Sequence, residues 1–386
     1  MRRVSPASPL RLPWIDQLRT AAILLVVNLH ACVTYSHVGD WYMMAETEPT
    51  MGAKVPFIVW QGMLQSFFMG LLFFVSAYFA AGSLARRGPG GFARERLVRL
   101  GLPALFYMLV IHPFILLALN PWNHDFGPPA AFYTRYLTSG RFLGSSGPLW
   151  FAVALLLFCL ALAAWKGAVG SSRSTPASAA PTAAPSGKLL LGAAIVLGLG
   201  SFAVRLVQPI GTNVLNLQLC FFVQYIAWFL AGLHAARHGW LASLAASPRA
   251  RTAGWLALVG GPLALLALLA YGAKNATPQT FFGGPHWQAF GFALWEQATG
   301  LGLALGALAL FSRRGNTETR FRRWLADRSF AVYVLHAPVL VALAMLFRGL
   351  PYHLYGLVVL LTVAGLAASY VLADLARRIP GLKSIL

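Results

Sequence analysis

Long apolar runs recur from one end of the chain to the other. Each is about 18 to 25 residues long, which is enough for a helix to cross a hydrocarbon core of roughly 30 Å. Inside a bilayer such a run must satisfy its own backbone hydrogen bonds, and a helix does so. We expect helices at residues 14–35, 57–82, 100–119, 147–165, 189–207, 217–236, 252–271, 287–311, 330–347 and 352–375. The sequence therefore predicts an all-α, polytopic integral membrane protein with about ten transmembrane helices.

The composition agrees with a lipid environment. Of the 386 residues, 58% are hydrophobic and only 10% are charged, whereas a soluble domain carries about 25% charged residues. The first apolar run is of full length and contains Asp16 and Arg19. We therefore expect it to remain as a membrane helix and not to be removed as a signal peptide.

The net charge of +20 could suggest a nucleic-acid partner, but the basic residues are distributed unevenly along the chain. With the N-terminus placed inside, 24 of the 30 lysines and arginines fall on the cytoplasmic side and 6 on the outer side. This alternation is the positive-inside pattern of membrane proteins. It predicts that both termini are cytoplasmic, and it explains the basicity without a nucleic acid.

One segment differs in composition from the rest. Residues 167–187 are rich in Ala, Ser, Pro and Gly, so we expect a flexible cytoplasmic linker within a single transmembrane domain of residues 1–386. Cys32, Cys159 and Cys220 all lie in expected helices, and we interpret them as small buried residues. No metal site is expected.

The first expected helix carries the most informative polar residues. Ionisable groups at membrane depth are costly and usually mark function. Arg19 and His30 are eleven residues apart, which places them within about 20° on one helix face and roughly 16 Å apart along the axis. Asp16 falls within about 40° of the same face. We predict that His30 is catalytic with Asp16 as a possible partner; a hydrogen-bonded structural histidine is the alternative.

Arginines gather where the third helix begins. Arg96 and Arg99 are neighbours at i, i+3, and Arg94 is close in sequence. The planar fork of arginine suits a phosphate group, so these residues predict an anionic ligand. A cluster that only sets membrane topology is the alternative.

Two further ionisable residues are expected at depth. Glu296 lies within the eighth expected helix, where a buried carboxylate must take up a proton or pair with a cation. It is therefore either a catalytic candidate or a structural partner of a histidine or arginine. His336 lies in the ninth expected helix, roughly two turns from its cytoplasmic end.

Six short motifs, in chain order, resemble the acyltransferase 3 family of bacterial membrane O-acyltransferases. They are Asp16-x-Leu18-Arg19 with His30, Phe73-Phe-Val-Ser-Ala-Tyr78-Phe, Arg96-x-x-Arg99-Leu-Gly-Leu-Pro103, Gly147-Pro-Leu-Trp150-Phe151, Trp228-Phe-Leu-Ala-Gly232 and Ser329-Phe-Ala-Val-Tyr333-x-x-His336-x-Pro338. The chain is most similar to the glucans biosynthesis protein C group, which shares Glu296 and the tail from Arg378 to Lys383. One departure is Ala77, where the family usually has glycine, and it leaves a close helix approach at that position open.

The resemblance implies a reaction and a set of roles. An acyl group would move from cytoplasmic acyl-CoA, a co-substrate and not a bound cofactor, to a hydroxyl of a carbohydrate or similar acceptor reached from outside the bacterial inner membrane. A histidine can act as the general base for such a hydroxyl. The implied catalytic residues are His30, Asp16 and Glu296. The implied donor-binding residues are Arg19, Arg94, Arg96, Arg99 and His336.

Two other classes of protein compete with this interpretation. A secondary transporter of a small anionic or sugar-like solute would also place ionisable groups at depth, but such transporters are commonly built from repeats, and the sequence shows no convincing one. A membrane sensor or assembly factor would not need His30 and Glu296 at depth.

Overall fold

The computed structural model describes residues 12–123, 127–170, 185–274, 276–351 and 353–385. Most of the expected linker at 167–187 lies outside the described residues. The described chain is almost entirely helical, and its one β-bridge joins Val214 to Leu217. The all-α prediction is confirmed.

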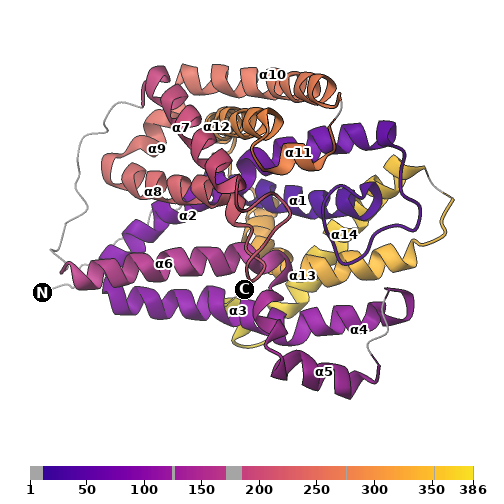
Figure 1. The fold of residues 1–386 in the computed structure, drawn as a ribbon. Helices are drawn as coiled ribbons and strands as arrows, with labels where there is room; N and C mark the ends of the chain where they lie inside the picture. Colours follow the sequence, from indigo (N-terminus) through magenta and orange to yellow (C-terminus); the bar gives the residue numbers. More distant parts are fainter. Residues whose placement is uncertain (1–11, 124–126, 171–184, 275, 352, 386) are drawn as a thin grey trace, which may run out of the picture.

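The helices follow the expected apolar runs along the chain (Figure 1). Their bounds are α1 Pro13–Ser36, α2 Met51–Arg96, α3 Leu102–Phe106, α4 His112–Asn123, α5 Pro129–Thr138, α6 Trp150–Ala168, α7 Gly187–Arg205, α8 Phe222–His238, α9 Trp240–Ala246, α10 Pro248–Gly272, α11 Gln279–Phe282, α12 Trp287–Arg314, α13 Arg320–Leu346 and α14 Leu354–Ala376. Two π-helical segments, η1 Leu97–Gly101 and η2 Tyr107–Ile111, join α2 to α3 and α3 to α4.

In the described part of the chain, nine helices are long and apolar enough to cross a membrane. One of them, Met51–Asn120, is 70 residues long and contains both the second and the third expected runs. At Gly88 the backbone leaves the helix, with φ 68° and ψ 170°, and Pro89 follows. Only glycine adopts this conformation without strain. Gly88 therefore separates two spans, and counting them separately gives the expected ten.

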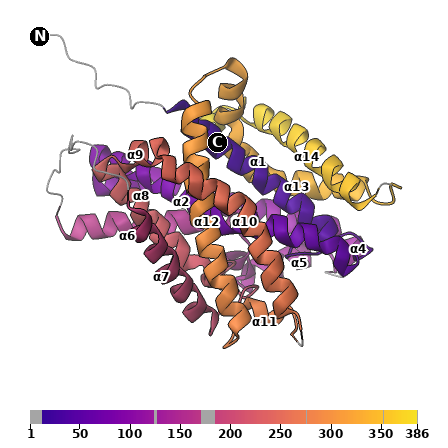
Figure 2. The same cartoon turned by 90° about the horizontal axis from the view of Figure 1, so that it is seen from above.

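Small residues let the central helices approach closely. In Figure 2, α12 runs through the middle of the bundle beside α10, where a Cβ added to Gly254 would lie 2.5 Å from the Cα of Gly306. On α8, a Cβ at Gly232 would collide with the carbonyl oxygen of Phe74 and lie 2.9 Å from the Cβ of Ala77. The close approach at Ala77 therefore exists, and the glycine that permits it is on the partner helix.

The first helix connects the two ends of the bundle. It packs against α2, α12, α13 and α14. We call the end where α1 begins the basic end, because Arg19 there interacts electrostatically with Arg96 and Arg99. At the far end, α1 continues into residues 37–50, which we call the outer segment. This non-helical segment is tied back onto α1 by a 2.7 Å hydrogen bond from the Ala45 amide to the Thr34 carbonyl.

The three cysteines are free and buried, as the sequence indicated. Burial in the interior of the bundle accounts for them without a disulfide or a metal.

Candidate functional site

Two histidines from opposite ends of the sequence meet in the bundle. The rings of His30 on α1 and His336 on α13 are stacked, with centroids 5.3 Å apart and planes 23° from parallel. Trp41 of the outer segment stacks on His30 at 3.8 Å and 18°. Figure 1 shows α1 and α13 side by side in this region. The sequence predicted a role for each histidine but did not predict that they touch.

Hydrogen bonding fixes the state of His336. Its Nδ1 lies 2.8 Å from the carbonyl oxygen of Tyr333. A carbonyl only accepts, so Nδ1 carries the proton and donates, and Nε2 is left as an acceptor in the neutral ring. His336 is fully buried, and its Nε2 is free to accept a hydrogen bond from a ligand.

Three polar atoms of this stack are buried without a hydrogen-bond partner among the described residues. They are Nδ1 of His30, Nε2 of His336 and Nε1 of Trp41. An unsatisfied buried polar atom costs about 1–3 kcal/mol, and such atoms are rare in native interiors. Three of them on contacting rings indicate a place where a hydrogen-bonding ligand is received.

A second row of aromatic residues supports Trp41. Its neighbour Tyr42 places its hydroxyl 2.7 Å from Nδ1 of His112 and 3.0 Å from the Tyr107 hydroxyl. Gly147 has a φ of 49°, and a Cβ there would collide with the Tyr42 hydroxyl. This explains why the Gly147-Pro motif needs glycine. Sequence reasoning missed Trp41 and Tyr42, whose only signal was an aromatic pair in the outer segment.

At the basic end, the arginines form a second cluster. The side chain of Arg19 is exposed and lies within electrostatic range of Asp16, Arg96 and Arg99. The guanidinium of Arg96 lies 5.0 Å from the centre of the Phe92 ring, and its Nε is buried without a partner in the described chain. Like charges converging in this way favour an anion between them.

Glu95, which the sequence analysis did not single out, organises the same cluster. It accepts a 2.9 Å hydrogen bond from Ser83 and forms ion pairs with Arg87 at 3.2 Å and Arg99 at 3.6 Å. Arg99 belongs to the π-helical segment η1, and π-helical turns often occur at functional sites. Arg94 is exposed and lies on α2 next to Glu95, at the edge of the cluster.

Asp16 belongs to the basic end and not to the histidine pair. It lies fourteen residues before His30 on one continuous helix, which is roughly 21 Å along the axis. It borders a small pocket with Arg322 and Arg323 at the start of α13. Hydrogen bonding from Asp16 to His30 is therefore ruled out by distance.

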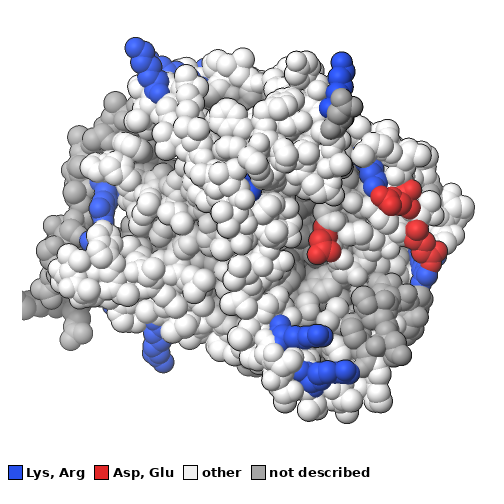
Figure 3. Space-filling view, in the orientation of Figure 1, with Lys and Arg blue, Asp and Glu red and all other residues white. Residues whose placement is uncertain are grey.

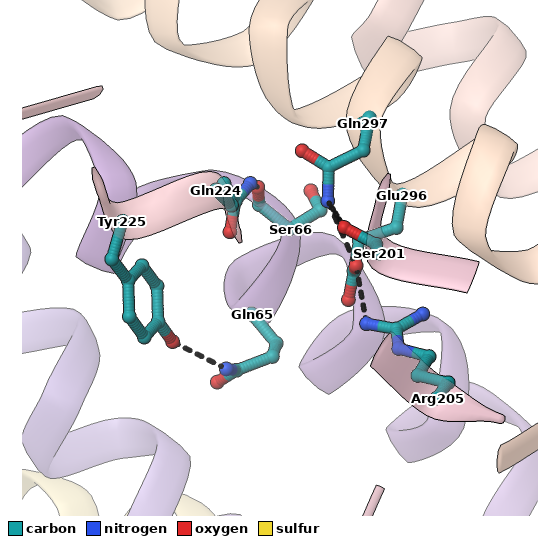
Figure 4. A network of polar contacts seen from close by, with 8 residues as sticks. All are labelled: Gln65, Ser66, Ser201, Arg205, Gln224, Tyr225, Glu296 and Gln297. Atoms are coloured by element: carbon teal, nitrogen blue, oxygen red, sulfur yellow. Dashed lines mark hydrogen bonds and ion pairs between the residues drawn. The ribbon is translucent and has the colours of Figure 1, made fainter. Parts of the chain in front are cut away.

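Glu296 is paired with a cation. Nη2 of Arg205 donates to its carboxylate at 2.6 Å, and the two side chains are 0% and 2% exposed. Figure 4 shows this pair between α7 and α12, with Gln297 donating to Glu296 at 3.0 Å and to Ser201 at 3.3 Å. The rest of the guanidinium lies over the rings of Phe221 and Phe292 at 5.3 and 5.9 Å.

A model of a protein family described as an acyltransferase domain matches residues 12–374. No curated protein and no solved structure matches the chain.

Proposed function

The chain belongs to this acyltransferase family, and on that premise we propose that it is a membrane O-acyltransferase using acyl-CoA and a hydroxyl acceptor. The carrying observation is the stack of His30, His336 and Trp41, with three buried polar atoms that lack partners in the described chain. A neutral imidazole at such a place can accept a proton from a hydroxyl. The family match favours this function over a transporter.

The arginine cluster supports a donor site at the basic end. Arg19, Arg96 and Arg99 would hold the phosphates of coenzyme A, since arginine forks bind phosphate in two-point contacts. Arg94, at the edge, would add charge without a fixed contact. His30 lies roughly 16 Å along α1 from Arg19, so the long arm of acyl-CoA would carry the thioester from one cluster to the other.

Transfer at the histidine pair would follow the chemistry of esters. The acceptor oxygen attacks the thioester carbonyl carbon while a ring nitrogen of His30 takes its proton. The carbon–sulfur bond then breaks, and the departing coenzyme A thiolate takes up the proton held by His30. Nε2 of His336 would accept a hydrogen bond from a second hydroxyl of the acceptor and orient the molecule. We assign Glu296 the role of holding α7 against α12 through Arg205, because its carboxylate is already engaged.

The orientation of the bundle is part of the proposal. The distribution of basic residues supports a cytoplasmic basic end, where acyl-CoA is made, and a far end outside a bacterial inner membrane. Reporter fusions at Gly315 and Glu46 test it. A cytoplasmic signal at Gly315 and an external signal at Glu46 are expected, and the reverse pair would contradict the donor assignment.

One experiment tests the function directly. Cell-envelope glycans, including glucans of the kind that the glucans biosynthesis protein C resemblance suggests, are compared by mass spectrometry with and without the gene. We expect an acyl mass to disappear without the gene, to return with the parent gene, and not to return with His30→Ala. An unchanged acyl profile of sugars and lipids would refute the proposal.

A further inference from the structure

A cavity of about 690 Å³ opens at the far end of the bundle, outward from the histidine pair. Its volume falls in the range of about 300–1,000 Å³ that is typical of small-molecule sites. The ends of α1 and α13, the start of α14 and the outer segment enclose it. The catalytic role proposed for His30 leaves this space unassigned.

The cavity is directly connected to the first helix above His30. Thr34, which lines it, donates its hydroxyl to the His30 carbonyl at 3.0 Å. Thr34 follows His30 by one helical turn, roughly 6 Å along the axis. A molecule in the cavity therefore lies next to the layer of the bundle that contains the imidazole pair.

Polar and apolar groups are segregated around this cavity. Its helical walls are apolar and include Leu119, Ala344, Met345 and Leu357, and Met43 and Met44 of the outer segment add to them. The unbranched methionine side chain adapts to ligands of varied shape. Such walls suit a hydrocarbon chain better than a sugar ring.

Charged groups form the rim and are already paired. Glu46 of the outer segment forms an ion pair with Arg348, and Glu48 forms one with Lys54. Hydrogen bonding from the Lys54 ammonium lowers the pKa of the Glu48 carboxyl below its ordinary value. In Figure 3, the acidic side chains visible on that face lie toward one end of the molecule, beside basic ones. Because Glu46 and Glu48 are paired with cations, they are less available to hydrogen-bond a large soluble saccharide at the rim.

One wall residue offers a hydrogen bond to a hydroxyl. Tyr35 lines the cavity, is 6% exposed, and its hydroxyl is buried without a partner in the described chain. A phenol that is kept inside without a partner costs free energy unless a ligand satisfies it. The cavity thus combines apolar walls with one buried polar contact.

We propose that this cavity binds an amphiphilic hydroxyl acceptor, a lipid-linked or alkyl-linked sugar, with its apolar chain against the walls and its hydroxyls toward Tyr35 and His30. This rests on the proposed acyltransferase function and names its acceptor class. The apolar chain supplies the affinity, at about 0.8 kcal/mol for each buried methylene, and the sugar supplies the hydroxyl that reacts.

Photolabelling of the full chain in lipid nanodiscs, without acyl-CoA, tests this site. The probe is decyl β-D-glucoside with a diazirine at the end of its alkyl chain, and labelled peptides are mapped by mass spectrometry. We expect label in residues 43–50 and 344–357, reduced by excess decyl glucoside and not by equal concentrations of maltotriose. In Met44→Trp and in Leu357→Trp we expect about tenfold weaker binding, the effect of excluding roughly two methylene groups.

The matched control is Leu143→Trp, an apolar-to-tryptophan change at an exposed residue outside the cavity, which is expected to label like the parent. Label that spreads evenly over the lipid-facing helices, or that is unchanged in both cavity variants, would overturn the site. If maltotriose competes as strongly as decyl glucoside, the ligand is a soluble saccharide and the proposal of an amphiphilic acceptor is wrong. The labelling is read without acyl-CoA and without turnover, so a failure of the catalytic proposal leaves this binding result standing.

Discussion

The protein contains two buried polar clusters that differ in one respect. In the cluster of Arg205 and Glu296, the carboxylate is engaged by a guanidinium and by Gln297, and the guanidinium is covered by two aromatic rings. In the cluster of His30, Trp41 and His336, the rings stack, yet each ring keeps a buried nitrogen without a partner in the described chain. The charges of the first cluster are paired, although Nε and Nη1 of Arg205 and Oε1 of Gln297 also lack hydrogen-bond partners in the described chain. In the second cluster the unpartnered atoms include nitrogens of two histidines, which can take up a proton.

This difference separates structure from chemistry. A closed ion pair contributes by holding two helices in register, and its net contribution appears mainly when one partner is removed. Unpartnered buried polar atoms cost free energy in both clusters. Catalysis also requires a group that can take up a proton, which the histidines offer and the paired Glu296 does not. We therefore place catalysis at the histidines and scaffolding at Glu296, and four experiments test that division.

The largest expected effect is on the rate of transfer in His30→Gln. Glutamine is similar in size and forms hydrogen bonds but cannot take the proton, so turnover should fall by about 10² to 10⁴. The measurement is thiol release from acyl-CoA by purified protein with a hydroxyl acceptor, alongside acyl-CoA binding, which should not change. If the variant keeps most of the parent's turnover, the cluster of His30, Trp41 and His336 is structural and His30 is not the base.

Glu296→Gln should act on stability, because it leaves a buried guanidinium without its counter-charge. Removing one partner of a buried pair costs about 3–5 kcal/mol, measured as a lower midpoint of unfolding in detergent. The double variant Arg205→Met with Glu296→Leu should recover most of that loss. Turnover per folded molecule should stay near the parent value; a loss of turnover at unchanged stability would transfer Glu296 to the catalytic site.

Arg96→Ala should weaken the binding of acyl-CoA and leave both buried clusters intact. A charge-assisted hydrogen bond to phosphate contributes about 1.5–3 kcal/mol, so acyl-CoA binding should fall roughly tenfold to a hundredfold while the acceptor requirement stays constant. Arg96→Lys should restore only part of it, because lysine lacks the planar fork. The control is Arg313→Ala, a basic residue outside the cluster; equal losses in both variants would indicate a general charge effect.

The smallest expected effect is that of Trp41→Ala, which removes the ring stacked on His30. An aromatic pair contributes about 0.5–1.5 kcal/mol, so turnover should fall roughly twofold to tenfold with normal acyl-CoA binding. Trp41→Phe should retain most of the activity, since it keeps a stacking face. Full activity in Trp41→Ala would show that the outer segment does not position His30.

The two clusters also show how far the sequence can be used alone. His30, His336 and Glu296 were all visible as ionisable residues at depth, because apolar runs make such exceptions conspicuous. The sequence could not assign them to different clusters. Glu296 was ambiguous until the structure showed Arg205 beside it. Asp16 shares a helix face with His30 but lies roughly 21 Å from it along the axis.

Turn geometry set another limit. Residues 83–99 lie between two expected helices, and the structure shows helix on both sides of one non-helical glycine, Gly88. Glycine and proline at 88 and 89 signalled a break, but their sequence did not reveal how short it is. Likewise, the departure at Ala77 left a close helix approach open, and Gly232 on α8 supplies the space for it.

What the sequence by itself determined is everything that depends on local properties. The length of the apolar runs fixed the helices, because a single segment in lipid satisfies its backbone hydrogen bonds within itself only as a helix. Spacing along a single helix placed His30, Arg19 and Asp16 on one face. Only the tertiary structure decided which side chains from different helices meet, since packing of small residues sets those contacts at long sequence separation. The pairing of His30 with His336, and of Arg205 with Glu296, belongs to that second class.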